Sequence, residues 1–76
     1  MEISRWLKAQ RTQAGLSQAQ LAHRIGASQQ LVGRWEAGNL PLHARWIRML
    51  EMVLDLDGEA ALELRRLQLA QYDGAA

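Results

Sequence analysis

The stretch LSQAQLAHRIGASQQLVGRWEAG, from Leu16 to Gly38, decides the fold of this chain. It contains two short helical patterns that are separated only by Gly26, Ala27 and Ser28. Two helices joined so tightly cannot lie antiparallel, so we expect them to cross steeply. A steep crossing leaves the second helix on the outside of the molecule, where its side chains are free to contact a partner.

Both patterns begin and end at residues that are typical of helix termini. Ser17 and Gln20 have the spacing of a capping box, in which each side chain bonds the backbone N–H of the other. Gly26 provides a positive φ at the end of the first helix, where a Cβ would be strained. Ser28 is a good N-cap, and Gly38 ends the second pattern. The sequence therefore predicts helices at 18–25 and 29–37.

Three further helices, and no strands, are predicted in the rest of the chain. Helical spacing of apolar residues places them at 2–13, from 42 onward, and at 58–71 with Asp57 as N-cap. The apolar face of the middle one consists of Leu42, Trp46, Met49, Leu50 and Val53. The prediction is a single all-α domain, residues 1–76, folded as a compact five-helix bundle.

Composition narrows the class of protein. The chain has 76 residues, 49% of them hydrophobic, and no cysteine, which excludes disulfides, thiolate zinc sites and cysteine nucleophiles. Its two histidines are too few and too far apart to suggest a metal site. No apolar run approaches the roughly 18 residues that a membrane span needs. We expect a cytoplasmic domain with no metal, no cofactor and no membrane contact.

Charge is distributed unevenly along the chain. Residues 1–48 carry seven Lys/Arg against two acidic residues, a net charge of +5, whereas residues 49–76 carry two Arg against six acidic residues, a net charge of −4. The basic part suggests a surface that faces a polyanion. The plainer alternative is a solvated surface with uneven charge.

On a helical wheel, the pattern at 29–37 directs Val32 and Trp35 inward. Its outward face carries Gln29, Gln30, Gly33, Arg34 and Ala37, with no acidic residue. A glutamine amide can bond adenine bidentately, and an arginine guanidinium can bond guanine in the same way. The major groove is about 12 Å wide and admits one α-helix. The alternative is that these are ordinary solvated side chains and that the glycine at position 33 arose by neutral drift on a solvent-facing surface.

The motif resembles the helix-turn-helix of the lambda-repressor/Cro (XRE) family. The residues that carry the resemblance are Arg11, Leu16-Ser17-Gln18, Leu21-Ala22, Ile25-Gly26, Ser28, Val32, Trp35-Glu36 and Gly38. The resemblance implies a homodimer that binds a near-palindromic operator in double-stranded DNA and controls transcription. It also implies a bacterial or phage origin.

The resemblance assigns roles residue by residue. The base-reading positions are Gln29, Gln30, Gly33 and Arg34; Gln18 is the position that binds a phosphate; and Arg11 and Glu36 form a structural ion pair. Ser28, Asn39 and Arg45, close to the pattern at 29–37, are expected to add phosphate contacts. The sequence departs from the family after the motif. Many relatives carry several basic residues there, whereas residues 39–43 are nearly uncharged.

The last third of the chain has more apolar residues than one helix face uses. Besides the predicted core, Ile47, Met52, Leu54, Leu56, Leu62 and Leu69 need cover. A two-fold interface built from residues 42–72 would bury part of this surface. Trp35 and Trp46 lie on the predicted apolar faces and are therefore interpreted as core residues rather than base-stacking groups.

Two functions from different classes remain at this point. The first is a sequence-specific DNA-binding regulator, a repressor that occupies its operator. The second is a protein-interaction module whose C-terminal helices bind a protein partner, such as a toxin neutralised by an antitoxin, with DNA binding secondary. We do not expect an enzyme, since the chain has no serine–histidine–carboxylate set, phosphate-binding glycine loop or paired carboxylates in a plausible pocket.

Overall fold

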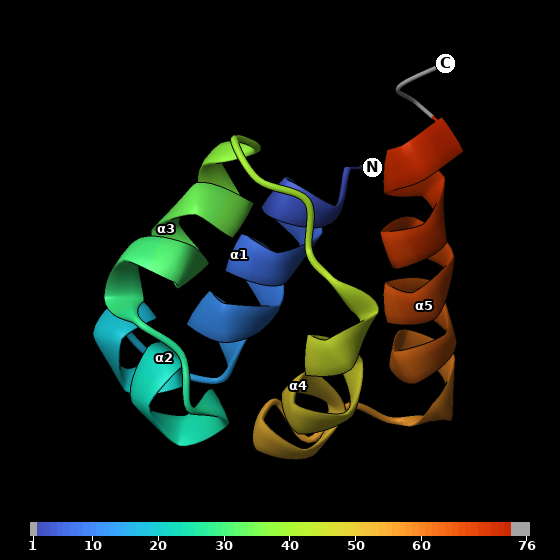
Figure 1. Cartoon of the computed structure of the whole chain (residues 1–76). Helices are drawn as coiled ribbons and strands as arrows, with labels where there is room; N and C mark the ends of the chain where they lie inside the picture. The colour runs from blue at the N-terminus through green and yellow to red at the C-terminus, as the bar shows by residue number, and fades with distance from the viewer. Residues whose placement is uncertain (1, 74–76) are drawn as a thin grey trace.

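The computed structural model describes residues 2–73. Within them the chain forms five α-helices and one short 3₁₀ helix, with no strand. The helices are α1 (Ile3–Gln13), α2 (Gln18–Ile25), α3 (Gln29–Ala37), η1 (Ala44–Trp46), α4 (Ile47–Val53) and α5 (Gly58–Asp73). Figure 1 shows α3 at the edge of the molecule, on the side opposite α5. The predicted all-α, five-helix fold is confirmed for this part of the chain.

The predicted signals between α2 and α3 are present in the structure. The capping box forms both bonds: Gln20 N donates to Ser17 Oγ at 3.0 Å, and Ser17 N donates to Gln20 Oε1 at 2.8 Å. Gly26 ends α2 with a φ of +78°, a left-handed conformation that favours glycine. Ser28 then caps α3, since its Oγ accepts from Leu31 N at 3.1 Å. These local bonds set the turn that places α3 outside.

All five helices contribute to one core. Leu7, Leu21, Val32, Leu50 and Leu64, one from each helix, are at most 1% exposed. Trp35 of α3 is also buried, and its ring meets the ring of the half-buried Trp46 edge-on, with 5.5 Å between the ring centroids. The interpretation as a core residue is therefore confirmed for Trp35, whereas Trp46 is only partly buried and packs against the core.

The region before α4 differs from the prediction. The chain stays non-helical to His43, whose Nδ1 accepts from Arg45 N at 3.0 Å, and a 3₁₀ turn precedes α4. A 3₁₀ turn has 3.0 residues rather than 3.6, so it rotates the faces of the helix that follows. Ile47 consequently faces the core at 8% exposed, while Met49, predicted to be buried, is 37% exposed.

Two further expectations on this surface need correction. Leu54 was expected to need cover from a partner, but it lies in the core at 8% exposed, as Ile47 does. Leu56 is half-buried and packs against the core. Met52, Leu62 and Leu69 remain exposed, as the sequence predicted. The apolar surplus is therefore smaller than the composition suggested.

The last helix holds the loop after α3 in place. Asp57 caps α5 as predicted, with Ala60 N donating to its Oδ1 at 2.7 Å. α5 continues to Asp73, two residues beyond the predicted end at Gln71. Gln71 bonds both backbone groups of Leu42: its Oε1 accepts from the N–H at 2.7 Å, and its Nε2 donates to the carbonyl at 2.9 Å.

None of the helices described is both long and apolar enough to cross a membrane.

Candidate nucleic-acid interface

The outer face of α3 presents free polar side chains. Gln29, Gln30 and Arg34 are exposed, and none of the three side chains forms a hydrogen bond within residues 2–73. On the opposite side of the same helix, Val32 and Trp35 are fully packed, at 0% and 2% exposed. The outer face is therefore held in position by the core while its amides and guanidinium remain available to a ligand.

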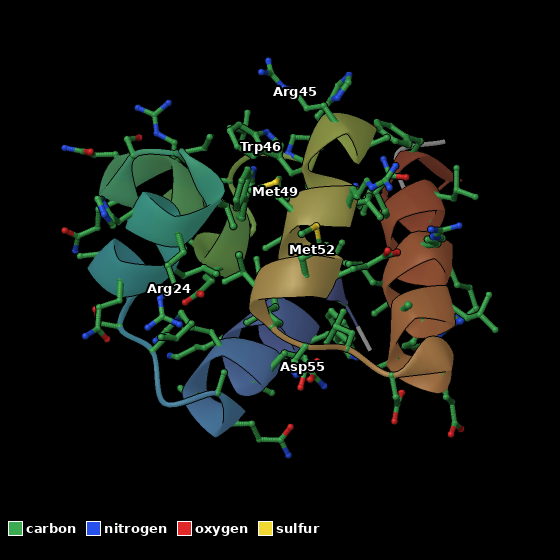
Figure 2. The ribbon with its side chains drawn as sticks, turned by 90° about the horizontal axis from the view of Figure 1, so that it is seen from below. Arg24, Arg45, Trp46, Met49, Met52 and Asp55 are labelled. Atoms are coloured by element: carbon green, nitrogen blue, oxygen red, sulfur yellow. The ribbon has the colours of Figure 1, made fainter. Side chains whose placement is uncertain are left out.

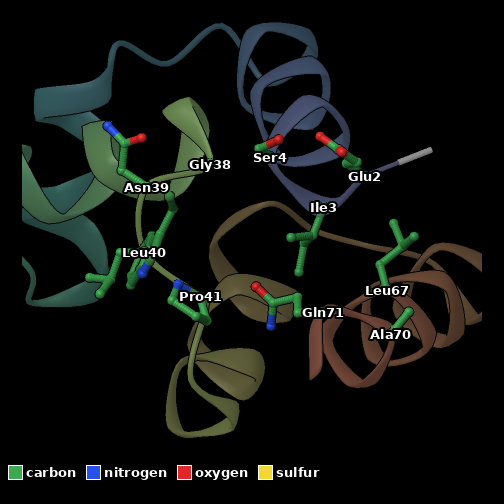
Figure 3. Close-up of a pocket in the computed structure, with 11 residues that line it drawn as sticks. Glu2, Ile3, Ser4, Gly38, Asn39, Leu40, Pro41, Leu67, Ala70 and Gln71 are labelled. Carbon is green, nitrogen blue, oxygen red and sulfur yellow. The ribbon is translucent and has the colours of Figure 1, made fainter. Parts of the chain in front are cut away.

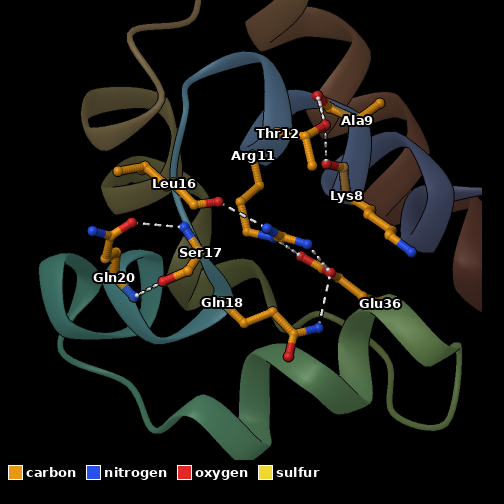
Figure 4. Close-up of polar contacts among 9 residues, drawn as sticks. All are labelled: Lys8, Ala9, Arg11, Thr12, Leu16, Ser17, Gln18, Gln20 and Glu36. Atoms are coloured by element: carbon orange, nitrogen blue, oxygen red, sulfur yellow. Dashed lines mark hydrogen bonds and ion pairs between the residues drawn. The ribbon is translucent and has the colours of Figure 1, made fainter.

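An ion pair fixes the inner side of α3 to α1. Arg11 Nε donates to Glu36 Oε2 at 2.7 Å, and Arg11 Nη2 donates to Glu36 Oε1 at 2.9 Å, so the contact is bidentate (Figure 4). The two side chains are only 10% and 3% exposed. Arg11 Nη1 also donates to the Leu16 carbonyl at 2.8 Å. The hydrogen bond to Glu36 raises the pKa of Arg11, although burial acts in the opposite direction.

Gln18 joins this network from the start of α2. Its Nε2 donates to Glu36 Oε1 at 3.1 Å, which brings the side chain across to α3 (Figure 4). One of its two amide N–H groups is thus used within the protein, and the other is left for a ligand. The sequence predicts a phosphate contact for Gln18 but does not indicate this bond. Its partner lies 18 residues further along the chain, so no local spacing could have indicated it.

Gly33 lies where Gln18 approaches α3. A Cβ at this position would meet only Gln18 Oε1, at 3.7 Å, which is an ordinary van der Waals contact. Its backbone is helical, so glycine is not required by φ either. The packing of the protein therefore gives no reason for a glycine here.

The other predicted phosphate-binding residues lie around α3. Ser28 is at its first turn, and since the hydroxyl oxygen accepts from Leu31 N, the O–H remains free to donate. Asn39 follows the end of α3 and is exposed. Arg45 belongs to η1; its guanidinium lies 5.1 Å from the centre of the Trp46 ring. The Trp46 ring in turn meets the ring of Trp35 on α3 edge-on.

A groove of about 490 Å³ lies behind the loop that follows α3 (Figure 3). Its walls come from Glu2 and the first turn of α1, Trp35 of α3, the loop at 38–41 and the last third of α5. Ile3, Pro41 and Leu67 supply much of its apolar wall, and none of the residues that line it is a lysine or an arginine. The groove therefore lacks the cations that a phosphate-binding surface needs.

Comparison with known protein families identifies the family of this chain. A family model described as a helix-turn-helix domain matches residues 2–64, which include α1 to α4 and the start of α5. No curated protein and no solved structure matches the chain significantly. Because the family model covers most of the chain, including α2, the turn and α3, the assignment does not depend on a short motif. The chain belongs to a family of helix-turn-helix DNA-binding domains.

Proposed function

We propose that the chain is a sequence-specific transcriptional regulator of the lambda-repressor/Cro (XRE) kind, which represses by occupying an operator. One observation carries the proposal: α3 combines a fully packed inner side with an outer side of unbonded amides and a guanidinium. A helix of this diameter fits the major groove, where such groups distinguish bases. The basic charge of residues 1–48 adds attraction to the phosphates.

Each residue of the interface has a role in this proposal. Gln29 and Gln30 bond adenine N6 and N7, and Arg34 bonds guanine O6 and N7. Gly33 lets the backbone of α3 approach the bases closely. Gln18 donates its second amide N–H to a phosphate oxygen while Glu36 holds the first. The remaining phosphate contacts come from Ser28, Asn39 and Arg45.

The regulator acts as a homodimer through residues 42–72. Met52, Leu62 and Leu69 remain exposed in this region, at 65% or more, and a partner subunit would cover part of them. Two-fold symmetry would place two copies of α3 about 34 Å apart, one turn of B-DNA, so that they enter successive major grooves. The operator is then near-palindromic.

Selection of bound duplexes from a random pool tests the proposal. We expect enrichment of a two-fold symmetric sequence, and binding to it that weakens steeply as salt rises. Gln29→Ala or Gln30→Ala should change the preferred base at one position of each half-site. If no sequence is enriched, or if the three side chains of the outer face can be replaced without changing the consensus, the proposed reading by α3 is wrong.

A second candidate function rests on the outer face of α5. Leu62, Leu69 and Tyr72 are 69%, 65% and 51% exposed, which suits a protein partner. In this case DNA binding would be secondary, as in an antitoxin that neutralises a toxin. A mobility-shift assay separates the two: the regulator shifts a duplex alone at moderate salt, whereas the interaction module shifts it only with its partner.

A further inference from the structure

The groove behind the loop that follows α3 has the size and the lining of a small-molecule site. Its volume of about 490 Å³ lies within the roughly 300–1,000 Å³ that is usual for such sites. Figure 3 shows Ile3 between Pro41 and Leu67, so three separate segments supply the apolar walls. The exposed Met49 and Met52, by contrast, lie along a single helix, α4 (Figure 2). The groove can therefore surround a ligand on several sides.

One buried polar side chain of the groove has no partner in the described part of the chain. Ser4 is 7% exposed, and its hydroxyl forms no hydrogen bond within residues 2–73. The Ser4 Oγ would lie 3.9 Å from a Cβ at Gly38, which places it where α1 meets the end of α3. No side-chain nitrogen or oxygen of the described residues is fully enclosed without a partner, so this hydroxyl is reached from the groove. It is therefore available to bond a ligand.

The carboxylate of Glu2 lies at the same end of the groove, beside Ser4 (Figure 3). Glu2 comes directly before α1, yet its side chain forms no capping bond. Within residues 2–73 the carboxylate has no ion pair either. A full negative charge without a partner thus lies next to the unbonded hydroxyl.

The helix ends around the groove add to this negative charge. Gly38 is the C-cap of α3, and Ala70 and Gln71 belong to the last turn of α5. The C-terminal end of a helix carries about half a negative charge, and the N-terminal end, here that of α1, about half a positive charge. Two negative helix ends and the Glu2 carboxylate outweigh the one positive end, and no lysine or arginine lines the groove. The groove therefore favours a cationic ligand over an anionic one.

We infer that the groove binds a small primary amine with an apolar body. The body packs between Ile3, Pro41 and Leu67. The ammonium group donates to the Glu2 carboxylate and to the Ser4 hydroxyl oxygen. An ammonium group has three N–H donors and no acceptor, which matches two oxygens that lack a donor.

Two amide side chains that also line the groove have other roles. Gln71 bonds the backbone of Leu42 with both its oxygen and its nitrogen. Asn39 is assigned to a phosphate by the proposed function, and Figure 3 shows its amide directed away from Ile3 and Gln71. The amine site therefore uses none of the residues proposed to contact DNA. The inference goes beyond the proposed function and does not depend on it.

Titration of the ¹⁵N-labelled whole chain with two amines, tryptamine and octylamine, tests the inference. Tryptophol has a hydroxyl in place of the ammonium group of tryptamine, and indole-3-propionate has a carboxylate there. We expect both amines to bind with a dissociation constant of about 1 mM or lower and to shift the backbone signals of Ile3, Gly38 and Ala70. Tryptophol should bind at least about fivefold more weakly than tryptamine, because it lacks the attraction to Glu2. Indole-3-propionate should not bind detectably.

Two variants locate the binding. Glu2→Gln should weaken tryptamine binding about fivefold and leave tryptophol binding unchanged, which a general loss of folding would not do. Its matched control is Glu59→Gln, at an exposed carboxylate in the first turn of α5, and it should change neither. Ala70→Phe fills the groove and should abolish the binding of both compounds, whereas Ala19→Phe, at an exposed alanine of α2, should not. Circular dichroism establishes that every variant is folded.

Three results would overturn the inference. They are an absence of shifts around the groove with both amines at about 10 mM, equal affinities for tryptamine and tryptophol, and tryptamine binding that Glu2→Gln or Ala70→Phe leaves unchanged. The titration contains no DNA, so it is separate from the test of the proposed function. A chain that selects an operator but binds no amine refutes only the amine site. A chain that binds the amines but selects no duplex refutes only the operator reading.

Discussion

The inner and outer sides of α3 use their polar side chains in opposite ways. On the inner side, the Glu36 carboxylate accepts from Arg11 and Gln18 and is almost completely buried. On the outer side, Gln29, Gln30 and Arg34 are exposed and form no side-chain bonds within the described chain. The inner side therefore stabilises the helix, and the outer side keeps its bonding capacity for a ligand. Substitutions on the two sides should separate folding from DNA binding.

The largest effect is expected from Glu36→Ala on the inner side. It leaves Arg11 buried without its partner, which should lower the free energy of unfolding by about 3 kcal/mol, the lower end for buried pairs. A chain of 76 residues has a small stability margin, so the variant should be largely unfolded near room temperature. Urea denaturation followed by circular dichroism measures the loss.

Glu63→Ala is the matched control for this prediction. The Glu63 carboxylate pairs with Arg66 on the surface of α5, with the Nε–Oε2 atoms at 3.0 Å. This substitution should leave the unfolding midpoint unchanged, because exposed pairs contribute little. If Glu36→Ala lowers the free energy of unfolding as little as Glu63→Ala does, the Arg11–Glu36 contact is not what holds α3 to α1.

On the outer side, Gln29→Ala and Gln30→Ala should weaken binding to the selected duplex by about 1–3 kcal/mol each. The free energy of unfolding should change by less than about 0.5 kcal/mol, since neither side chain has a hydrogen-bond partner within the described residues. Fluorescence anisotropy with the selected and a scrambled duplex measures the difference. The control is Gln13→Ala, an exposed glutamine at the end of α1. Equal losses on both duplexes would show that the glutamines do not read bases.

Ser28 belongs to both sides of the comparison, since it caps α3 and is also proposed to donate to a phosphate. Ser28→Ala removes the bond to Leu31 N and should cost about 1 kcal/mol of stability. Ser28→Asp keeps a capping oxygen but brings a negative charge to the interface. It should therefore retain stability and lose DNA affinity. If Ser28→Asp binds DNA as the wild type does, this position lies away from the phosphates.

The smallest effect, and one of opposite sign, is expected from Gly33→Ala. The added Cβ has room, and alanine favours a helix, so stability should rise by about 0.5–1 kcal/mol. Affinity for the selected duplex should fall, because the methyl group separates α3 from the bases. Thermal unfolding and anisotropy on one preparation measure both changes. A variant that is stabilised and binds unchanged would identify the glycine as neutral.

Much of this fold could be predicted because its signals are local. The capping box of Ser17 and Gln20 and the stop at Gly26 act within a few residues, so the sequence alone placed α2 and α3. The exposure of Gln29, Gln30 and Arg34 followed from the helical period once Val32 and Trp35 were assigned to the core.

What the sequence did not reveal depends on contacts between distant residues or on a change of helix type. The bond from Gln18 to Glu36 spans 18 positions of the sequence, and the bonds between Gln71 and Leu42 span 29 positions. Contacts over such separations leave no local pattern in the sequence. The 3₁₀ turn at 44–46 rotated α4, so the predicted exposures of Met49 and Ile47 were exchanged. Apolar periodicity assumes 3.6 residues per turn and misses such a shift.

The central claim, that α3 reads DNA with its outer side, is tested most directly by titrating ¹⁵N-labelled chain with the selected duplex. The account predicts that the largest shifts fall on the side-chain amides of Gln29 and Gln30 and on the backbone around them, with the Arg11–Glu36 side little changed. Shifts concentrated on α5, with the amides of α3 unmoved, would contradict it.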